Sequence, residues 1–104
     1  MRYDIILSPE ANVDFNSLNA NVRSQVRSAM ETYLRHEPTK TSKSRIKRLR
    51  GMSRPQYRLR VGDDIRVFYD IRGNVVEILA IISKADVNDW LEKHGESDEA
   101  NSAD

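Results

Sequence analysis

A run of alternating side chains around a short turn constrains the fold of this chain more than any other feature. Apolar Tyr57, Leu59 and Val61 alternate with arginines at positions 58 and 60, which is the pattern of a half-buried β-strand. Residues 62–64, Gly-Asp-Asp, favour a turn, and a second apolar run begins at Ile65. The sequence therefore predicts an antiparallel hairpin here.

The turn determines which residues of the hairpin face each other. A three-residue loop places Arg60 opposite Arg66 and Arg58 opposite Phe68, so that three arginines share one sheet face. Like charges directly across two strands destabilise the pair by about 1 kcal/mol or less. A face that carries this cost favours an anionic ligand. The alternative is a solvated outer face of an antiparallel sheet, because such faces are often charged.

The charges of the chain are separated along its length. Residues 1–34 carry three Lys or Arg and four Asp or Glu, whereas residues 35–66 carry eleven and three. Residues 67–104 carry three and nine, so the net charges of the three parts are −1, +8 and −6. The middle third is therefore a candidate surface for a polyanion, which the net charge of +1 for the whole chain conceals.

Length and composition exclude several classes of protein. A chain of 104 residues can enclose one hydrophobic core, and no window approaches the roughly 20 apolar residues of a membrane-spanning helix. The first residues also lack the apolar core of a signal peptide. The absence of cysteine excludes disulfides, a cysteine nucleophile and thiolate metal sites, and it fits a reducing cytoplasm.

Two helices are expected between a short strand at residues 3–7 and the basic middle third. Ser8 can cap a helix that has Pro9 at its first position, and residues 19–21, Asn-Ala-Asn, break this helix and can cap a second one. Residues 36–38, His-Glu-Pro, end the second helix, because the residue before a proline avoids the helical conformation. Two antiparallel helices with a short connection can cover one face of a sheet.

A second hairpin and a closing helix complete the predicted elements. The dipeptide Gly73-Asn74 between two apolar runs is a strong hairpin signal. The core pairs expected across this hairpin are Ile71–Val76, Tyr69–Ile78, Val67–Ala80 and Ile65–Ile82. Residues 86–94 are expected to form a helix whose apolar stripe covers part of the second sheet face. Residues 39–54 have little periodicity, and we expect an ordered surface loop there.

The predicted order of elements is β-α-α-β-β-β-α, which is an α+β fold. It contains a small, mainly antiparallel four-stranded sheet, a helical hairpin on one face of the sheet and a short C-terminal helix. A single domain is expected over residues 1–95. Residues 96–104 are acidic and too polar to pack against a core, so we expect a disordered tail there.

Three segments read K-R-L-R-G over residues 47–51, Y-R-L-R-V-G-D-D-I-R-V-F-Y-D-I over residues 57–71 and V-V-E-I-L-A-I over residues 75–81. With the helical hairpin, they resemble the RelE/ParE superfamily of toxins from bacterial type II toxin–antitoxin pairs, across residues 2–92. The resemblance implies a RelE-like toxin fold with an exposed, basic concave face. It also implies a cytoplasmic protein that forms a hetero-oligomer with a cognate antitoxin and needs no cofactor or metal.

The RelE branch of this superfamily implies a ribosome-dependent mRNA endoribonuclease that cuts in the A site and inhibits translation. In that chemistry the ribose 2′-OH attacks the adjacent phosphate, which needs a base, cations on the phosphate and an acid for the leaving oxygen. The matching positions in this chain are Arg58, Arg60 and Arg66, with Lys84 as a fourth catalytic candidate. We expect Arg66 to hold the transition state and the other two arginines to orient RNA, because a guanidinium binds two phosphate oxygens at once.

The basic segment before the first hairpin supplies candidate contacts to RNA and to the ribosome. These residues are Lys43, Arg45, Lys47, Arg48, Arg50 and Arg54. All of them belong to the part of the chain with the net charge of +8.

This chain departs from the family pattern at the positions of the acid and the base. Members that use a base often have lysine or glutamate there, and the arginines of this chain hardly release a proton. Many members also have an arginine or histidine after the last strand and then a tyrosine, where this chain has Lys84, Ala85 and Trp90. Two alternatives therefore remain: a ParE-like toxin that inhibits DNA gyrase without nuclease chemistry, and an inactive relative that only binds its antitoxin.

Overall fold

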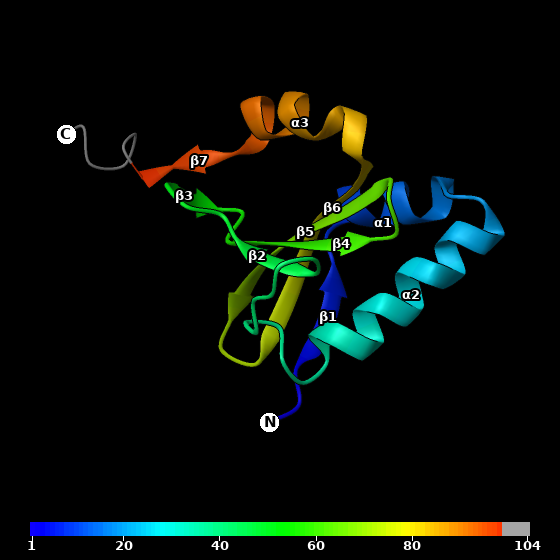
Figure 1. Ribbon diagram of the computed structural model, residues 1–104, viewed down its shortest axis with the longest axis horizontal. Coiled ribbons are helices and arrows are strands. Elements are labelled where there is room, and N and C mark those ends of the chain that lie inside the picture. Colours follow the sequence, from blue (N-terminus) through cyan, green and yellow to red (C-terminus); the bar gives the residue numbers. More distant parts are fainter. Residues whose placement is uncertain (99–104) are drawn as a thin grey trace.

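The computed structural model describes residues 1–98 and shows an α+β fold in three layers (Figure 1). The helices are α1 (Pro9–Ser17), α2 (Ala20–Leu34) and α3 (Val87–His94), with a 3₁₀ turn η1 (Lys84–Asp86) before α3. The strands are β1 (Asp4–Leu7), β2 (Ile46–Arg48), β3 (Met52–Arg54), β4 (Tyr57–Val61), β5 (Ile65–Arg72), β6 (Val75–Ser83) and β7 (Glu96–Ser97).

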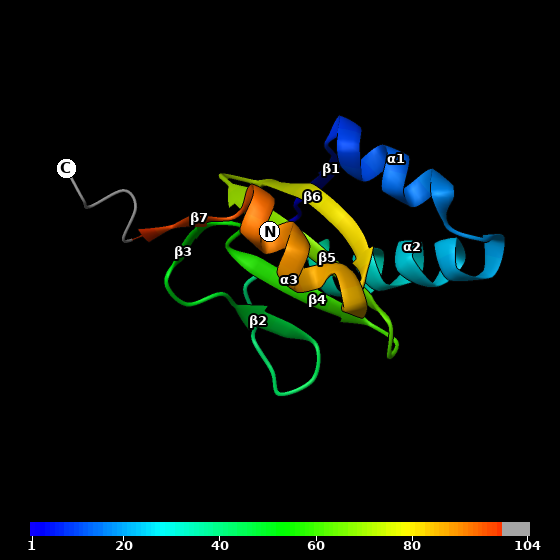
Figure 2. The same cartoon turned by 90° about the horizontal axis from the view of Figure 1, so that it is seen from above.

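One five-stranded sheet forms the middle layer, in the order β1-β6-β5-β4-β2. β1 is parallel to β6, and every other pair in this sheet is antiparallel. Helices α1 and α2 pack on one face, whereas α3 crosses the other face (Figure 2). The predicted α+β fold class is confirmed, and the sheet has one strand more than the four expected.

Both predicted helix starts are present. The Ser8 side chain accepts a hydrogen bond of 3.1 Å from the Ala11 backbone N–H, and Pro9 is the first residue of α1. The Asn19 side chain accepts a hydrogen bond of 2.9 Å from the Val22 backbone N–H at the start of α2. These caps fix where the helical hairpin begins and turns, so that its apolar residues face the sheet.

The hairpin of β4 and β5 has the predicted register. Val61 pairs with Ile65, Arg60 with Arg66 and Arg58 with Phe68. Gly62 begins the turn with a φ of +61°, a conformation that costs glycine little. The alternate residues of the two strands face α1 and α2 and form the core with them. The fully or nearly buried members of this core are Ala11, Val26, Met30, Leu34, Ile46, Leu59, Val61, Val67, Tyr69, Val76, Ile78 and Ile81.

The register of the second hairpin is right near its turn and wrong beyond it. Ile71 pairs with Val76 and Tyr69 with Ile78, as predicted. A β-bulge then inserts Leu79 as an extra residue. Beyond the bulge the pairs are Phe68–Ala80, Val67–Ile81, Arg66–Ile82 and Ile65–Ser83, in place of the predicted Val67–Ala80 and Ile65–Ile82. The bulge therefore brings Ile81 into the core.

The predicted surface loop at residues 39–54 contains two short strands. β2 pairs with β4 at the edge of the main sheet, and its first residue, Ile46, is 1% exposed. β3 pairs with β7, so Glu96 and Ser97 do not belong to a disordered tail as we expected. Pairing of such short strands depends on backbone hydrogen bonds, which an apolar pattern does not reveal. The rest of the predicted tail, residues 99–104, lies outside the described residues.

Candidate nucleic-acid interface

The sheet face opposite α1 and α2 carries a cluster of cations from three neighbouring strands. We call the surface formed by Lys47, Arg58, Arg60 and Arg66 the basic face. Lys47 of β2 lies opposite Arg58 of β4, and Arg60 of β4 lies opposite Arg66 of β5. The predicted clustering of the three arginines is therefore present, and β2 adds a lysine to it. Each like-charge pair across two strands opposes sheet formation.

Arg58 is half-buried without a compensating charge. Its Nε atom is buried and has no hydrogen-bond acceptor within the part of the chain that the structure describes. Burial lowers the pKa of Arg58, and the positive charges of Arg66 and Arg60 lower it further. A guanidinium in this environment remains charged, because even a lowered arginine pKa lies far above neutral pH. An anion bound here would supply the missing partner.

Arg66 and Arg60 differ in how they are held. Arg66 is only 6% exposed, its Nη1 donates a hydrogen bond of 3.0 Å to the carbonyl oxygen of Ile65, and no carboxylate of residues 1–98 forms an ion pair with it. Arg60 donates to the Gly62 carbonyl at 3.0 Å and to the Asp63 carboxylate at 2.9 Å. Asp63 is fully exposed, so this ion pair is weak and a phosphate can replace it.

Helix α3 lies across the same sheet face (Figures 1 and 2). Trp90 of α3 stacks on Phe68 of β5 with a centroid distance of 5.1 Å and an interplanar angle of 15°. The ring of His94, one turn further along α3, is tilted against the Trp90 ring at a centroid distance of 5.4 Å. The apolar stripe of α3 therefore covers part of this sheet face at Phe68, as the sequence predicted. The cover has a physical cause, because Phe68 and Ala80 on this face are fully buried and need an apolar partner.

Carboxylates surround an arginine on the other side of that stack. Arg54 of β3 forms ion pairs with Asp70 at 3.4 Å, Glu77 at 3.8 Å and Glu96 at 3.9 Å. Asp70 is buried and accepts a hydrogen bond of 2.8 Å from the Gln56 backbone N–H. Burial raises the pKa of Asp70, and the hydrogen bond from Gln56 and the charge of Arg54 act against that increase. Arg54 therefore connects β3, β5, β6 and β7, and its charge is not available to RNA.

Lys84 lies at the end of the sheet where the basic face is. It is the first residue of η1, it is exposed, and its backbone N–H donates a hydrogen bond to the Asp64 carbonyl oxygen in the β4–β5 turn. The structure thus places Lys84 beside the turn that joins the strands of Arg60 and Arg66. No contact of its side chain identifies it as an acid or a base.

The remaining predicted RNA contacts are exposed, and one of them has a structural role. Lys43, Arg45, Lys47 and Arg50 project from β2 and its flanking loops. Arg48 instead donates hydrogen bonds to the carbonyl oxygens of Leu49 at 2.9 Å and Gln56 at 2.7 Å, and lies over the Tyr57 ring. Residues 1–98 contain no group of three or more His, Cys, Asp or Glu that could hold a metal ion.

Residues 5–88 match the family model described as the ParE toxin of the parDE type II toxin–antitoxin system. The chain belongs to this family. A comparison with curated proteins found no match for this ParE-family toxin. Within the described residues of the toxin, no helix is long and apolar enough to span a membrane.

Solved toxin–antitoxin complexes contain chains with the fold of this ParE-family toxin. A chain of the RelBE2 complex from Mycobacterium tuberculosis has a TM-score of 0.64 and 22% identity, over 81% of the toxin and 100% of that chain. A chain of the archaeal RelE–RelB complex from Pyrococcus horikoshii has a TM-score of 0.65 and 24% identity, over 81% and 97%. A chain of the DinJ–YafQ complex from E. coli has a TM-score of 0.59 and 15% identity, over 84% and 98%. The expected RelE-like arrangement is confirmed.

Proposed function

We propose that this toxin is a ribosome-dependent endoribonuclease that cuts mRNA in the A site and thereby inhibits translation. The observation that carries the proposal is the unpaired charge of Arg58 and Arg66 on one sheet face. Burying cations beside one another is unfavourable unless a ligand compensates. The phosphate of a nucleic-acid backbone provides two oxygens to each guanidinium, which suits this arrangement.

The proposed reaction needs little covalent chemistry from the protein. The ribose 2′-OH loses its proton to water and attacks the adjacent phosphorus, the bond to the 5′-oxygen breaks, and that oxygen takes up a proton from water, so that a 2′,3′-cyclic phosphate and a 5′-hydroxyl are formed. Arg66 is fixed by burial and stabilises the charge that develops on the phosphate oxygens, while Arg58 and Arg60 orient the strand. The ribosome holds the mRNA in the reactive geometry, and this orientation accounts for much of the rate.

The proposal includes a cognate antitoxin as the partner that neutralises the toxin in a hetero-oligomer. The structural neighbours described in the preceding subsection are chains of toxin–antitoxin complexes, and the basic face offers the charge that an acidic antitoxin segment would bind. An antitoxin on this face would compete directly with RNA for the three arginines.

Primer extension on a defined mRNA, with and without programmed ribosomes, tests the proposal. Cuts within A-site codons are expected only with ribosomes, and Arg66→Ala should reduce the cleavage rate by about 100-fold or more. Arg72→Ala is the matched control, because Arg72 is an exposed arginine on the same strand and face. It should cut like the wild type. Intact mRNA at toxin concentrations that stop growth would overturn the proposal.

A second candidate function is inhibition of DNA gyrase by binding alone. The observation that favours it is the composition of the basic face, whose four residues are three arginines and a lysine, with no histidine or carboxylate among them to act as acid or base. A supercoiling assay with purified gyrase separates the two functions. Inhibition of supercoiling without cleavage of mRNA would select this second function.

A further inference from the structure

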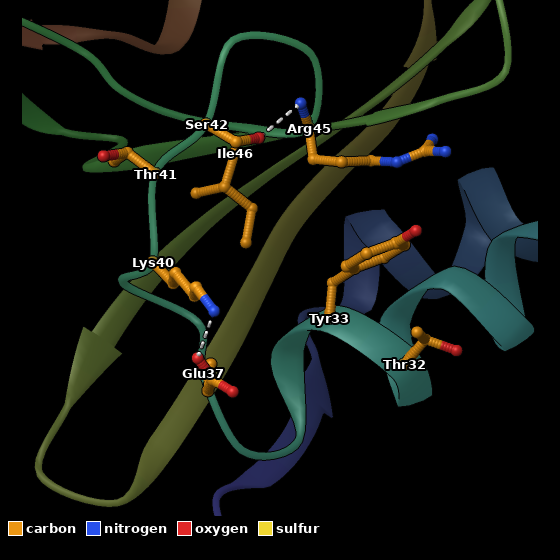
Figure 3. A pocket seen from close by; sticks show the side chains of 8 residues that line it. All are labelled: Thr32, Tyr33, Glu37, Lys40, Thr41, Ser42, Arg45 and Ile46. Carbon is orange, nitrogen blue, oxygen red and sulfur yellow. Dashed lines mark hydrogen bonds and ion pairs between the residues drawn. The ribbon is translucent and has the colours of Figure 1, made fainter.

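A cavity of about 410 Å³ lies between the C-terminal half of α2 and the loop that leads into β2 (Figure 3). We call it the Tyr33 pocket. Its apolar wall is formed by the Tyr33 ring and by Ile46, whose side chain points into the space between the loop and the helix. Lys40 and Glu37 close one end with an ion pair of 3.3 Å, and Arg45 closes the other. The pocket thus combines an apolar wall with cations at its rim.

Arg45 is positioned for an anion that the protein does not provide. Its guanidinium lies over the Tyr33 ring with the Cζ atom 5.0 Å from the ring centroid, and this cation–π contact holds the group at the pocket. Its backbone N–H donates a hydrogen bond of 3.0 Å to the Ser42 hydroxyl, which orders the loop that carries it. Within residues 1–98 no carboxylate forms an ion pair with Arg45. The donors at the edge of the guanidinium are therefore free for a phosphate.

The Tyr33 pocket is connected to the basic face through Arg45. The same side chain lines a second hollow of about 230 Å³, together with Arg60 and the β4–β5 turn residues Gly62 and Asp63. Arg45 also lines a third hollow of about 530 Å³ that continues along α2. A strand bound at Arg60 can therefore reach the Tyr33 pocket by way of Arg45, which lines both hollows.

We propose that the Tyr33 pocket binds one nucleotide of single-stranded RNA, at a position removed from the phosphate held by the basic face. The base lies against Tyr33 and Ile46, and its phosphate binds Arg45. Bases pack on aromatic and guanidinium planes regardless of sequence. The proposal rests on the proposed function for the choice of RNA as the polyanion, but it does not require cleavage.

An acidic peptide is the other polyanion to be tested. RNA is favoured because cations continue beyond the Tyr33 pocket. Lys47 and Arg50 line a neighbouring hollow that shares Thr41, Ser42 and Ile46 with the pocket, and neither cation forms an ion pair with a carboxylate in the described part of the chain. Exposed cations of this kind suit the repeated phosphates of a nucleic-acid strand.

Binding of a fluorescein-labelled ten-nucleotide 2′-O-methyl RNA, followed by anisotropy at fixed salt, tests the proposal. The 2′-O-methyl groups prevent cleavage through the 2′-OH. Arg45→Ala should weaken binding by about tenfold, as expected for loss of a stacked phosphate contact. Arg27→Ala is the matched control, because Arg27 is an exposed arginine over an aromatic ring, 5.4 Å from Phe15, away from the pocket. It should bind like the wild type, and equal affinities for both variants would overturn the proposal.

Photo-crosslinking locates the bound base and separates this inference from the proposed function. A single 4-thiouridine in the RNA should crosslink to the peptide that carries Tyr33, and Tyr33→Leu should remove this crosslink. If the wild type fails to cut mRNA but still crosslinks at Tyr33, the proposed function fails while the pocket assignment stands. A glutamate-rich peptide that binds in an Arg45-dependent manner, when RNA does not, would overturn the assignment in favour of a protein partner.

Discussion

The arginines at the two ends of the sheet face beneath α3 differ in their carboxylate partners. At one end Arg54 has three carboxylates at 3.4 to 3.9 Å. At the other end Arg58 and Arg66 have none among residues 1–98. Phe68, stacked on Trp90, lies between Arg66 and the buried Asp70 along β5, so an apolar barrier separates the two environments.

This difference separates an arginine that serves the fold from arginines that are available to a ligand. The positive charge of Arg54 stabilises the neighbouring carboxylates, and its ion pairs connect strands that would otherwise make few contacts. Arg58 raises the energy of the folded state, because it is partly buried beside two other cations. A cost of this kind is typical of functional sites, where the ligand and not the protein supplies the compensating charge.

The largest effect on stability is expected for Arg54→Ala. The change leaves the carboxylate of Asp70 buried without its cation, and it should lower the free energy of unfolding by about 1–2 kcal/mol. This loss of stability is smaller than the loss expected for a fully buried ion pair, because the Arg54 side chain is 35% exposed. Arg72→Ala, which removes an exposed arginine from the same face, should change stability by less than about 0.5 kcal/mol. Urea unfolding followed by circular dichroism measures both, and equal effects would contradict a structural role for Arg54.

Arg58→Met is expected to act in the opposite direction, with a smaller effect. Methionine keeps the apolar part of the side chain and removes a repulsive charge, so the free energy of unfolding should rise by about 0.5–1 kcal/mol. The gain should shrink in high salt, which screens the repulsion in the wild type. Arg72→Met is the control, because Arg72 is an exposed arginine outside the basic face, and it should change the free energy of unfolding by less than about 0.5 kcal/mol. A loss of stability as large as that of Arg54→Ala would show that Arg58 is also a structural residue.

The register of the β4–β5 hairpin and the clustering of its arginines were predictable, because a short turn and a two-residue period determine both. In the second hairpin, the turn and the period do not determine the register beyond the residues next to the turn. Leu79 and its neighbours are apolar on both faces, so the sequence pattern suits two registers equally well and does not reveal the bulge.

Other features were not predictable because they depend on contacts between distant parts of the chain. Arg54 was expected to bind RNA with its neighbours, and only the fold brings Asp70, Glu77 and Glu96 to it. β2, β3 and β7 have two or three residues each, too few for a period to be recognised. The Tyr33 pocket likewise forms only when β2 joins the sheet beside α2.

Asp70→Asn is expected to have the smallest effect, on how stability depends on pH. Burial raises the pKa of Asp70 above its ordinary value of 3.8, so the folded state binds the proton more tightly than the unfolded state. The contribution of Asp70 to stability is therefore full below pH 3.8 and is lost as the pH rises through its raised folded pKa. Asparagine keeps an acceptor for the Gln56 N–H but does not titrate, so the variant should gain stability relative to the wild type across this pH window. Urea unfolding between about pH 3 and pH 7 measures the difference. If the stability of Asp70→Asn relative to the wild type falls as the pH rises, the attraction between Arg54 and Asp70 outweighs the cost of burying Asp70. The carboxylates around Arg54 would then be better compensated than the cations of the basic face.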